Sequence, residues 1–545
     1  MNIPELPSVF SKFVVSALLI AVVGCGGNEE EVILLECEPK TCEELGYACG
    51  EQTDNCGNAI DCLECEAGYD CEQNQCVALD LVERLESISG LTVQEITSHE
   101  PGTEAYLLHL EQPEDHGAPE GNSFRQRMVL IHRDVNAPLV LHTLGYGLGL
   151  YGSNPSTATE RLTEPTQLLE ANELLVEHRY FGVSVADYPE WSHLNIWQSA
   201  NDSHQIRQAF ASIYQQPWIG TGVSKGGMTA VFHHRFFPDD LDGIVPYVTP
   251  ITFGFDDERY QIHMDSIGPA DGLCRERVEG MAREFIERRD EAADYVAQRA
   301  SEADSVDRET LESLVASRAI GYPMSFWQYW GSNYACAYLP HWGTAMEDFA
   351  PWFISEPAAL FYQYGFEPTV GPYSYQVANE LGQPAYANPQ LEDVLEYIDF
   401  ERLQQFAPGP MPWGDNPTFD PQAMVDIDEY LRHQADRVLA LYGEWDPWSG
   451  GMITLNEQGD NSLYVAPGLH HGATLSDLPN SEREEAVAQL MRWAYPDDYE
   501  YQALVAARAG QSLFTWDVEG HRQLADGIAE QEQRLLHKLW AFDIY

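Results

Sequence analysis

The feature that most constrains this chain is an alternation of two hydrophobic periods between about residues 100 and 250. Short apolar runs predict buried strands, and the segments between them place apolar residues at helical spacing. Strands that alternate with helices indicate a parallel sheet with helices on its faces. The predicted strands cover 127–132, 139–144, 174–178, 218–222 and 243–248, and the predicted helices cover 203–214 and 226–237.

The strand pattern stops near residue 256 and resumes at 437–442 and 462–465, followed by a helix over 482–493. The segment between, 256–433, contains helical stretches, of which 276–300 is the clearest, and loops rich in Gly, Pro and aromatic residues. An insertion of this size predicts a mostly helical cap domain over the functional edge of one interrupted sheet. The two parts of that α/β core are then 80–255 and 434–495.

A serine flanked by two glycines lies between a predicted strand and a predicted helix. Residues 222–226 read Gly-Val-Ser-Lys-Gly, which is the nucleophile-elbow pattern of α/β-hydrolases. The glycines are needed because a Cβ at either position would collide with the neighbouring strand or helix. We therefore expect an α/β-hydrolase sheet with Ser224 as its nucleophile; a structural glycine-rich turn is the alternative.

A serine needs a base and an orienting acid, which in this fold class follow it in the order Asp or Glu, then His. Asp446 lies in the loop after a later strand, and Glu444 and Asp239 are weaker candidates for the acid. One strand further along come His470 and His471, only one of which can be the base.

Two backbone amides are expected to bind the oxyanion of the reaction. One is the N–H of Lys225, and the second lies in the loop after the 139–144 strand, at Tyr146 or Gly147. Lys225 is one of only four lysines in the chain. We expect its side chain to point away from the serine and to pair with a buried carboxylate.

Five segments together resemble one family. They are Glu-His-Arg-Tyr-Phe-Gly at 177–182, Ser-Lys-Gly-Gly-Met at 224–228, Phe-Trp-Gln-Tyr at 326–329, Tyr-Gly-Glu-Trp-Asp-Pro-Trp at 442–448 and Pro-Gly-Leu-His-His-Gly at 467–472. Over about residues 100–495 the chain resembles the secreted bacterial prolyl tripeptidyl aminopeptidases, serine peptidases that remove tripeptides from free N-termini. A sister family, the Pro-X carboxypeptidases and lysosomal dipeptidyl peptidases, shares the Glu-His-Arg-Tyr and Asp-Pro-Trp segments.

The resemblance implies that Ser224 is the nucleophile, Asp446 the acid and His471, which directly precedes Gly472, the base. The pattern of the sister family would select His470 instead. The implied activity is removal of short peptides, tripeptides above all and with a proline preference, from free N-termini. It requires peptide substrates and no cofactor or metal.

An aminopeptidase must also hold a protonated N-terminus, for which a carboxylate near the nucleophile is suited. Glu177 is the candidate, and an internal ion pair with Arg179 is the alternative. Trp327 and Tyr329 are candidates for the wall of an apolar pocket for proline; they fit equally well as part of the core of the cap.

The N-terminus has the pattern of an export signal. An apolar run over 13–23 is too short to span a bilayer comfortably and ends in Val-Val-Gly-Cys at 22–25, which resembles the cleavage site of a bacterial lipoprotein. We expect residues 1–24 to be removed, Cys25 to be lipidated and 25–36 to form a tether. The protein would then be held on a bacterial membrane, in the periplasm or at the cell surface; an ordinary secretory signal is the alternative.

Eight of the eleven cysteines lie between residues 37 and 76. This segment has few large apolar residues, so cross-links must replace a core. In an exported chain the eight cysteines predict four disulfides, whose pairing the sequence does not determine. The module would act as a spacer or would bind an unknown surface ligand. Cys274 and Cys336 are candidates for a further disulfide in the cap.

Net charge excludes two classes of partner. With 87 Asp and Glu against 29 Lys and Arg, the chain carries −58 and is a poor match for nucleic acid or for anionic lipid. The sequence contains no His-Glu-x-x-His motif, which would have indicated a metallohydrolase. A carboxylesterase or lipase with the same triad, and a surface-tethered binding protein with an inactive hydrolase body, remain as alternatives. A helical extension is expected over 496–545.

Overall fold

The computed structural model describes residues 37–496 apart from 66–68, 153, 362–365, 387 and 407–409. The predicted signal sequence, the lipidation site Cys25, the tether and, save for Pro496, the extension over 496–545 lie outside these residues. The chain divides between Ala78 and Leu79 into two compact units, which we call the module and the body. Within the described residues, no helix has the length and apolar character to cross a bilayer.

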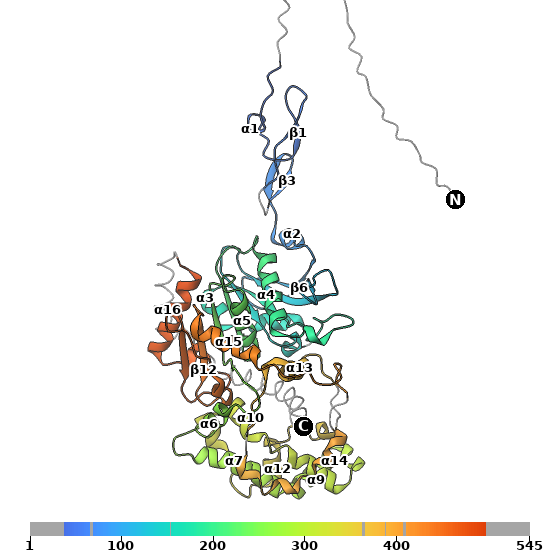
Figure 1. Cartoon of the computed structure of the whole chain (residues 1–545), viewed down its shortest axis with the longest axis vertical. Helices are drawn as coiled ribbons and strands as arrows, with labels where there is room; N and C mark the ends of the chain where they lie inside the picture. Colours follow the sequence, from blue (N-terminus) through green and yellow to red (C-terminus); the bar gives the residue numbers. More distant parts are fainter. Residues whose placement is uncertain are drawn as a thin grey trace, which may run out of the picture. The chain divides into compact units, whose positions relative to one another are not determined.

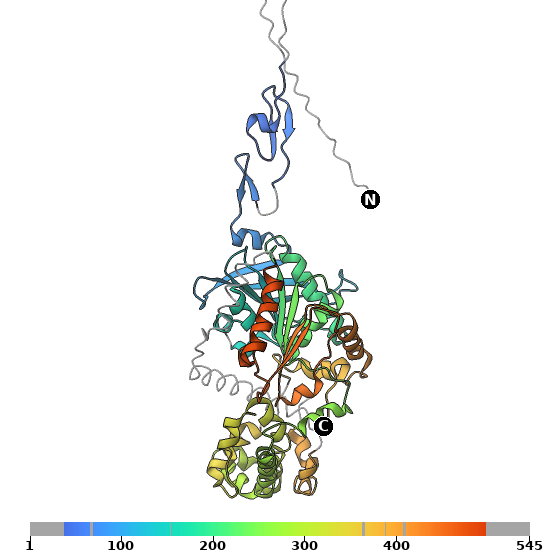
Figure 2. The same ribbon diagram turned by 90° about the vertical axis from the view of Figure 1, so that its left-hand side faces the viewer.

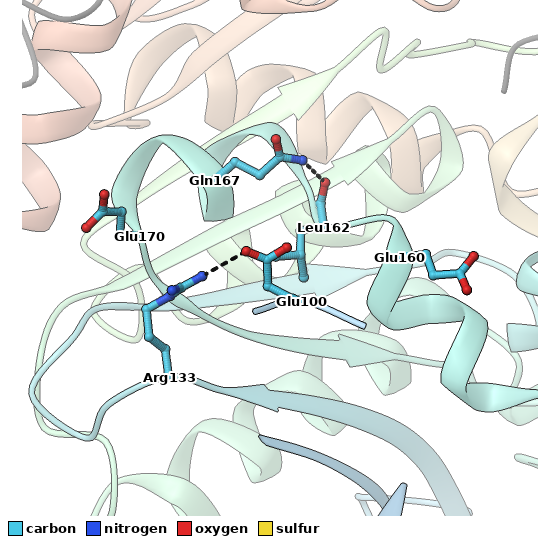
Figure 3. Close-up of a pocket in the computed structure, with 6 residues that line it drawn as sticks. All are labelled: Glu100, Arg133, Glu160, Leu162, Gln167 and Glu170. Carbon is cyan, nitrogen blue, oxygen red and sulfur yellow. Dashed lines mark hydrogen bonds and ion pairs between the residues drawn. The ribbon is translucent and has the colours of Figure 1, made fainter. Parts of the chain in front are cut away.

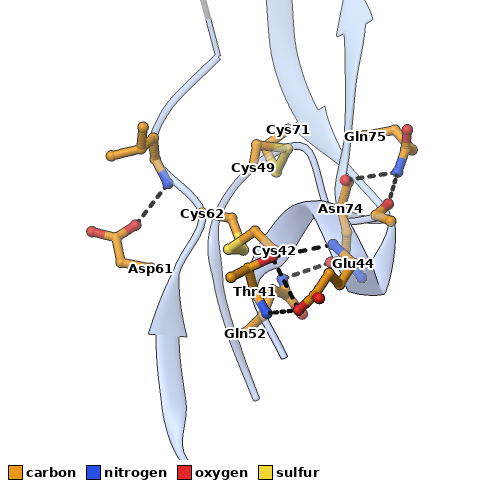
Figure 4. Close-up of a disulfide and its surroundings, with 12 residues drawn as sticks. Thr41, Cys42, Glu44, Cys49, Gln52, Asp61, Cys62, Cys71, Asn74 and Gln75 are labelled. Atoms are coloured by element: carbon orange, nitrogen blue, oxygen red, sulfur yellow. Dashed lines mark hydrogen bonds between the residues drawn. A yellow bond between two sulfur atoms is a disulfide. The ribbon is translucent and has the colours of Figure 1, made fainter. Parts of the chain in front are cut away.

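The module consists of one short helix and two antiparallel hairpins. They are α1 (Cys42–Leu45), β1 (Glu51–Thr53) with β2 (Ala59–Asp61), and β3 (Tyr69–Glu72) with β4 (Gln75–Ala78). Four disulfides join Cys37 to Cys56, Cys42 to Cys62, Cys49 to Cys71 and Cys65 to Cys76. Two of them lie close to α1 in Figure 4. The predicted four disulfides are confirmed, and their pairing is now defined.

Very little of the module is buried. Of its described residues only Cys49, Asp54 and Cys62 are shielded from solvent. The sulfurs of Cys49, Cys65 and Cys76 lie within 4.8 Å of one another, but each is oxidised in a disulfide and therefore offers no thiolate to a metal. Covalent links take the place of an apolar core here, as expected for so short a polar segment.

The body is built on a nine-stranded sheet with the order β13-β12-β11-β10-β8-β9-β7-β6-β5. Strands β8 to β13 run parallel, and β5, β6 and β7 form an antiparallel edge that joins the rest through β9. The strands are β5 (Leu91–Ile96), β6 (Glu104–Pro113), β7 (Ser123–His132), β8 (Leu139–Thr143), β9 (Asn172–Val176), β10 (Trp218–Val223), β11 (Gly243–Tyr247), β12 (Leu439–Gly443) and β13 (Ser462–Ala466).

The sequence predicts the six parallel strands and, at 127–132, more than half of the antiparallel β7. Strands with helices on both faces give the clearest signal, because they are continuous apolar runs. Strands β8, β9, β11 and β12 are buried at every position. The sequence analysis missed β5 and β6, in which buried and exposed residues are interspersed. A partly solvated strand of this kind gives a weaker signal than an uninterrupted apolar run.

Helices cover both faces of the sheet (Figure 2). Residues of α4, α5 and α15 share one apolar cluster with Leu139 and Leu141, whereas α3 and α16 share another with Val140, which points to the opposite face. The helices around the sheet are α2 (Leu81–Glu86), α3 (Glu164–Leu169), α4 (Ile196–Phe210), α5 (Lys225–Phe236), α13 (Pro372–Gln376), α15 (Gln422–His433) and α16 (Asn480–Ala494). This arrangement confirms the predicted α/β-hydrolase fold.

The remaining helices form the cap around a separate apolar cluster (Figure 1). They are α6 (Glu258–Met264), α7 (Leu273–Glu287), α8 (Arg289–Ala297), α9 (Arg308–Ser317), α10 (Tyr322–Tyr329), α11 (Asn333–Tyr338), α12 (Met346–Phe349) and α14 (Phe400–Leu403). A disulfide joins Cys274 to Cys336, as the sequence suggests.

Two details of the cap differ from expectation. The helix predicted over 276–300 is interrupted at Arg288, whose φ of −99° and ψ of 23° are not helical, so α7 and α8 are separate. Helix α15 falls inside the expected cap range of 256–433, yet its Met424, Ile427 and Leu431 belong to the core of the sheet.

Candidate active site

Ser224 occupies a strained turn between β10 and α5. Its φ of 55° and ψ of −121° lie in a region that a residue with a Cβ rarely adopts. A Cβ at Gly222 would come within 2.3 Å of the carbonyl carbon of Gly226, and a Cβ at Gly226 within 2.3 Å of the Thr143 oxygen. The two glycines therefore let strand and helix approach closely enough to hold a half-buried serine at the edge of the sheet.

The predicted acid and base are hydrogen-bonded to each other. Nδ1 of His471 lies 2.7 Å from Oδ2 of Asp446, which is fully buried. The second oxygen of Asp446 accepts the Trp448 N–H at 3.0 Å, so this carboxylate also caps the turn that follows it. Donation from Nδ1–H to the carboxylate leaves Nε2 of His471 as the proton acceptor.

Three of the parallel strands deliver the three residues to one edge. Ser224 follows β10, Asp446 follows β12 and His471 follows β13, and the carboxyl ends of parallel strands lie on the same edge of a sheet. Nε2 of His471 is buried and has no hydrogen-bond partner among the residues that the structure describes. A buried acceptor of this kind is suited to a proton that arrives during reaction.

His470 has a different environment from its neighbour. Its Nδ1 accepts the N–H of Gly472 at 3.0 Å, and burial lowers its pKa below the usual value. The backbone N–H of His471 donates to the carbonyl of Gln328 in the cap helix α10 at 3.1 Å. The cap therefore contributes directly to the position of the loop that bears His471.

The expected oxyanion loop is held at several backbone atoms. The Tyr146 carbonyl accepts the N–H of His178 at 3.1 Å. The Gly147 N–H donates to the carbonyl of Thr369 at 2.9 Å, and the Leu148 N–H donates to the Glu177 carboxylate at 2.6 Å. The Gly147 amide already donates within the protein, so of the two candidates it is the less suited to bind an oxyanion.

Glu177 is completely buried and surrounded by internal donors. Besides Leu148, its carboxylate accepts from Arg127 at 2.5 Å, from the hydroxyl of Ser184 at 2.7 Å and from the N–H of Val183 at 3.2 Å. The alternative considered from the sequence, an ion pair with Arg179, is wrong, because Arg179 instead binds Asp202 through two hydrogen bonds.

The side chain of Lys225 also differs from expectation. Its Nζ donates to the carbonyl of Gly145 and lies over the rings of Phe181 and Tyr146, 4.7 and 5.4 Å from their centroids. Within the described part of the chain no carboxylate forms an ion pair with Lys225, so the predicted partner is absent there. Burial lowers the pKa of this amine well below its usual value.

The two cap residues expected to line a substrate pocket lie at the end of α10. Trp327 is 1% exposed and packs edge-on against Trp445, with ring centroids 5.8 Å apart, so the structure places it inside the core of the cap. Tyr329 is half-buried.

A polar crevice of about 540 Å³ lies at the opposite edge of the sheet (Figure 3). Two of its residues, Arg133 and Glu170, precede β8 and β9, whereas Ser224 follows a strand. Arg133 pairs with Glu100 across the crevice at 3.3 Å. Its lining consists of Glu100, Arg133, Glu160, Leu162, Gln167 and Glu170. The crevice is therefore separate from the site that contains Ser224.

The sequence analysis missed the contacts that position the site through backbone atoms. The carbonyls of Thr369 and Gln328 hold the loops of Gly147 and His471. His263 of α6 contacts the Asp446 carbonyl at 2.9 Å. A backbone carbonyl is present in every residue type, so no sequence signal marks the contacts of Thr369 and Gln328.

Comparison with known proteins identifies a family and one similar characterised enzyme. A family model described as PS-10 peptidase S37 matches residues 74–524. A prolyl tri/tetrapeptidyl aminopeptidase from Streptomyces mobaraensis is 32% identical over 423 residues, which cover 76% of this chain and 85% of that protein.

Two solved structures match most of this chain at low sequence identity. A proline iminopeptidase from Mycobacterium smegmatis is 14% identical, with a TM-score of 0.28, and the match covers 77% of this chain and 98% of that chain. A peroxisomal α/β-hydrolase from Saccharomyces cerevisiae is 12% identical, with a TM-score of 0.30, and the match covers 77% and 96%. The fold assignment rests on the strand order and the helices, and we draw nothing more from these two structures.

Proposed function

The chain belongs to the S37 family of serine peptidases, and from this premise we propose that it releases short peptides from free N-termini through an acyl-enzyme formed on Ser224. The observation that carries the proposal is the hydrogen-bonded His471–Asp446 pair on the same sheet edge as the strained serine, in which Nε2 of His471 has no hydrogen-bond partner among the described residues. We propose tripeptides as the released products and a preference for proline; similarity to the Streptomyces prolyl tri/tetrapeptidyl aminopeptidase supports both.

Each step has a residue suited to it. Nε2 of His471 takes the proton of the Ser224 hydroxyl as its oxygen attacks the scissile carbonyl, and Asp446 stabilises the resulting imidazolium. The oxyanion accepts hydrogen bonds from the backbone N–H groups of Lys225 and Tyr146. Collapse breaks the C–N bond, and His471 gives its proton to the departing amine. Water then attacks the acyl-enzyme with the same base and releases the peptide.

Glu177 has a positioning role in this proposal. Because its carboxylate binds four internal donors and is fully buried, we propose that it holds the oxyanion loop at Leu148 rather than contacting the substrate amine. Recognition of the free N-terminus then falls to other groups around the site, and Tyr329 stays a candidate for the pocket wall.

We also propose export and lipid anchoring through Cys25. Four disulfides in the module support an oxidising compartment outside the cytosol, and the Val-Val-Gly-Cys segment supports acylation. Metabolic labelling with a fatty-acid analogue should mark the wild type and leave Cys25→Ser unlabelled; equal labelling of both would exclude this site.

The experiment that tests the activity combines active-site labelling with product analysis. A fluorophosphonate probe should label the wild type at Ser224 and leave Ser224→Ala unmodified. Mass spectrometry of the products from a peptide mixture then reads the cleavage position, and a matched pair of tripeptidyl anilides, one free and one acetylated, tests the need for the amine. Cleavage of both anilides together with faster turnover of a short-chain aryl ester would favour the carboxylesterase alternative. Absence of labelling would favour an inactive body with a binding role.

A further inference from the structure

The mechanism above gives the side chain of Lys225 no role. It is 3% exposed and its amine lies among aromatic rings, with the Gly145 carbonyl as its hydrogen-bond acceptor. An amine taken out of water without a counter-ion costs free energy. The position is close to the chemistry, because Ser224 is the preceding residue.

The carbonyl that Lys225 binds belongs to the same peptide group as the N–H of Tyr146. A trans peptide group is planar, and its C=O and N–H point in opposite directions. A donor that fixes the direction of the Gly145 carbonyl therefore fixes the direction of the Tyr146 N–H as well. It also polarises the group, which makes this N–H a stronger donor in a buried site.

The next two peptide groups of the loop have their own anchors. The group between Tyr146 and Gly147 is held at its oxygen by His178 and at its N–H by Thr369. The group that follows is held by Glu177 at the Leu148 N–H. The bond from Lys225 extends this series to the first peptide group. The close fit of Gly145 against α5, where a Cβ would come within 2.5 Å of the Gly226 nitrogen, keeps the carbonyl within reach of Nζ.

We propose that Lys225 is a positioning residue for the oxyanion site, supplying one donor from its backbone and orienting the other donor through its side chain. The inference rests on the proposed function, since it presumes an acyl-transfer reaction at Ser224. A lysine suits this role because its long flexible stem ends in a compact donor, which lies over two rings here, whereas the planar fork of arginine would need more space. The Lys225 amine can donate a hydrogen bond to the Gly145 carbonyl in both its protonated and its neutral form.

The test is Lys225→Met, which keeps the apolar stem and removes the donor. Loss of one oxyanion donor typically costs about 10²–10³ in turnover. Here the donor is misdirected rather than lost, so we expect kcat for a tripeptidyl anilide to fall about 10- to 100-fold with KM within about threefold of wild type. Affinity for a peptide aldehyde, whose adduct with Ser224 places an oxygen in the oxyanion site, should fall by the same factor.

Two control variants separate this effect from general damage. Leu490→Ala opens a cavity beside α16, on the face of the sheet opposite α5. It should lower Tm without the selective fall in kcat at constant KM that is expected of Lys225→Met. Lys40→Met removes an exposed lysine of the module and should leave both constants unchanged. If Lys225→Met does not fold, Lys225→Leu, which also lacks a donor, should give the same fall in kcat with KM unchanged.

A folded variant at position 225 that keeps the wild-type kcat, or that loses kcat without losing aldehyde affinity, overturns the inference. Labelling of the wild type by the fluorophosphonate is measured first. If the wild type is not labelled, the proposed function itself fails; if it is labelled and active while Lys225→Met matches it, only the role of Lys225 fails.

Discussion

The module and the body reach a defined structure by different physical routes. The described part of the module buries three residues and is held by four disulfides. The body encloses several apolar clusters and also buries ionisable side chains such as Arg179, Glu177 and Lys225. A buried charge needs fixed partners, and a group with fixed partners is preorganised. Cross-links alone give a shape, whereas a large core also gives oriented polar groups on which chemistry depends.

The strongest test of this contrast separates activity from the module. His471→Ala should lower kcat by about 10⁴–10⁶ while the fold persists, because the serine loses its base. Deletion of residues 37–78 should leave kcat/KM for short peptides within about twofold of the full chain, since no predicted site residue lies there. Both are measured by steady-state kinetics on a tripeptidyl anilide. A deletion that lowers kcat/KM more than tenfold would mean that the module contributes to catalysis and would contradict the comparison.

Next in size is the effect of a buried ion pair in the body. Asp202 is 2% exposed and binds Arg179 and His116. Burial alone would raise its pKa, yet the bonds from Arg179 and His116 hold that pKa below the usual value. Asp202→Asn leaves Arg179 buried without a counter-charge and should lower the free energy of unfolding by about 3–5 kcal/mol.

The matched control for that change is Asp426→Asn. Asp426 pairs with Arg235 but is 48% exposed, so the substitution should cost less than about 1 kcal/mol. Denaturant unfolding followed by tryptophan fluorescence measures both variants. Equal losses would mean that burial is not what distinguishes the charges of the body.

Removing a cross-link should affect the module more than the cap. The Cys49–Cys71 disulfide closes a loop with a sequence separation of 22. Its replacement by two serines should remove about 3 kcal/mol and unfold a segment that has almost no core. Replacing Cys274 and Cys336 should lower the Tm of the body yet leave the cap folded, because its helices share an apolar cluster. Hydrogen exchange resolves the two regions; loss of protection in the cap would contradict the comparison.

The last test concerns a pH dependence that arises in the body. Glu380 accepts the Ile196 N–H at 2.9 Å, and burial together with the charge of Asp420 raises its pKa from 4.5 to about 7. A raised folded-state pKa stabilises the protein fully below the unfolded value of 4.5, and this contribution is lost as pH rises from there through about 7.

Glu380→Gln keeps an acceptor for Ile196 and removes that titration. Relative to this variant, the wild type should therefore be equally stable near pH 4 and less stable at pH 8. The difference is at most about 3 kcal/mol, at about 1.4 kcal/mol per pKa unit. Thermal unfolding across this pH range is the measurement. A gap that narrows with rising pH would contradict the assigned direction.

Local sequence pattern was sufficient to predict much of the fold and part of the site. The apolar runs of β8 to β12 and the glycines around Ser224 predict the sheet and its sharp turn, because burial on both faces and close backbone approach restrict residue type. The order along the chain of Ser224, Asp446 and the two histidines also fits the α/β-hydrolase topology, in which the acid and then the base follow the serine. The edge strands β5 and β6 were not predicted, since side chains of mixed polarity fit a half-solvated edge.

Residue type by itself determined the fold class of the body, the covalent nature of the module and the identity of the strained serine. Only the tertiary structure decided which histidine contacts Asp446, which cysteines pair, and what surrounds Glu177 and Lys225. The reason is that these outcomes depend on distances between segments far apart in the chain. The residue type of a carboxylate or an amine in the sequence is the same whether its side chain faces solvent, a substrate or the carbonyl of a neighbouring loop.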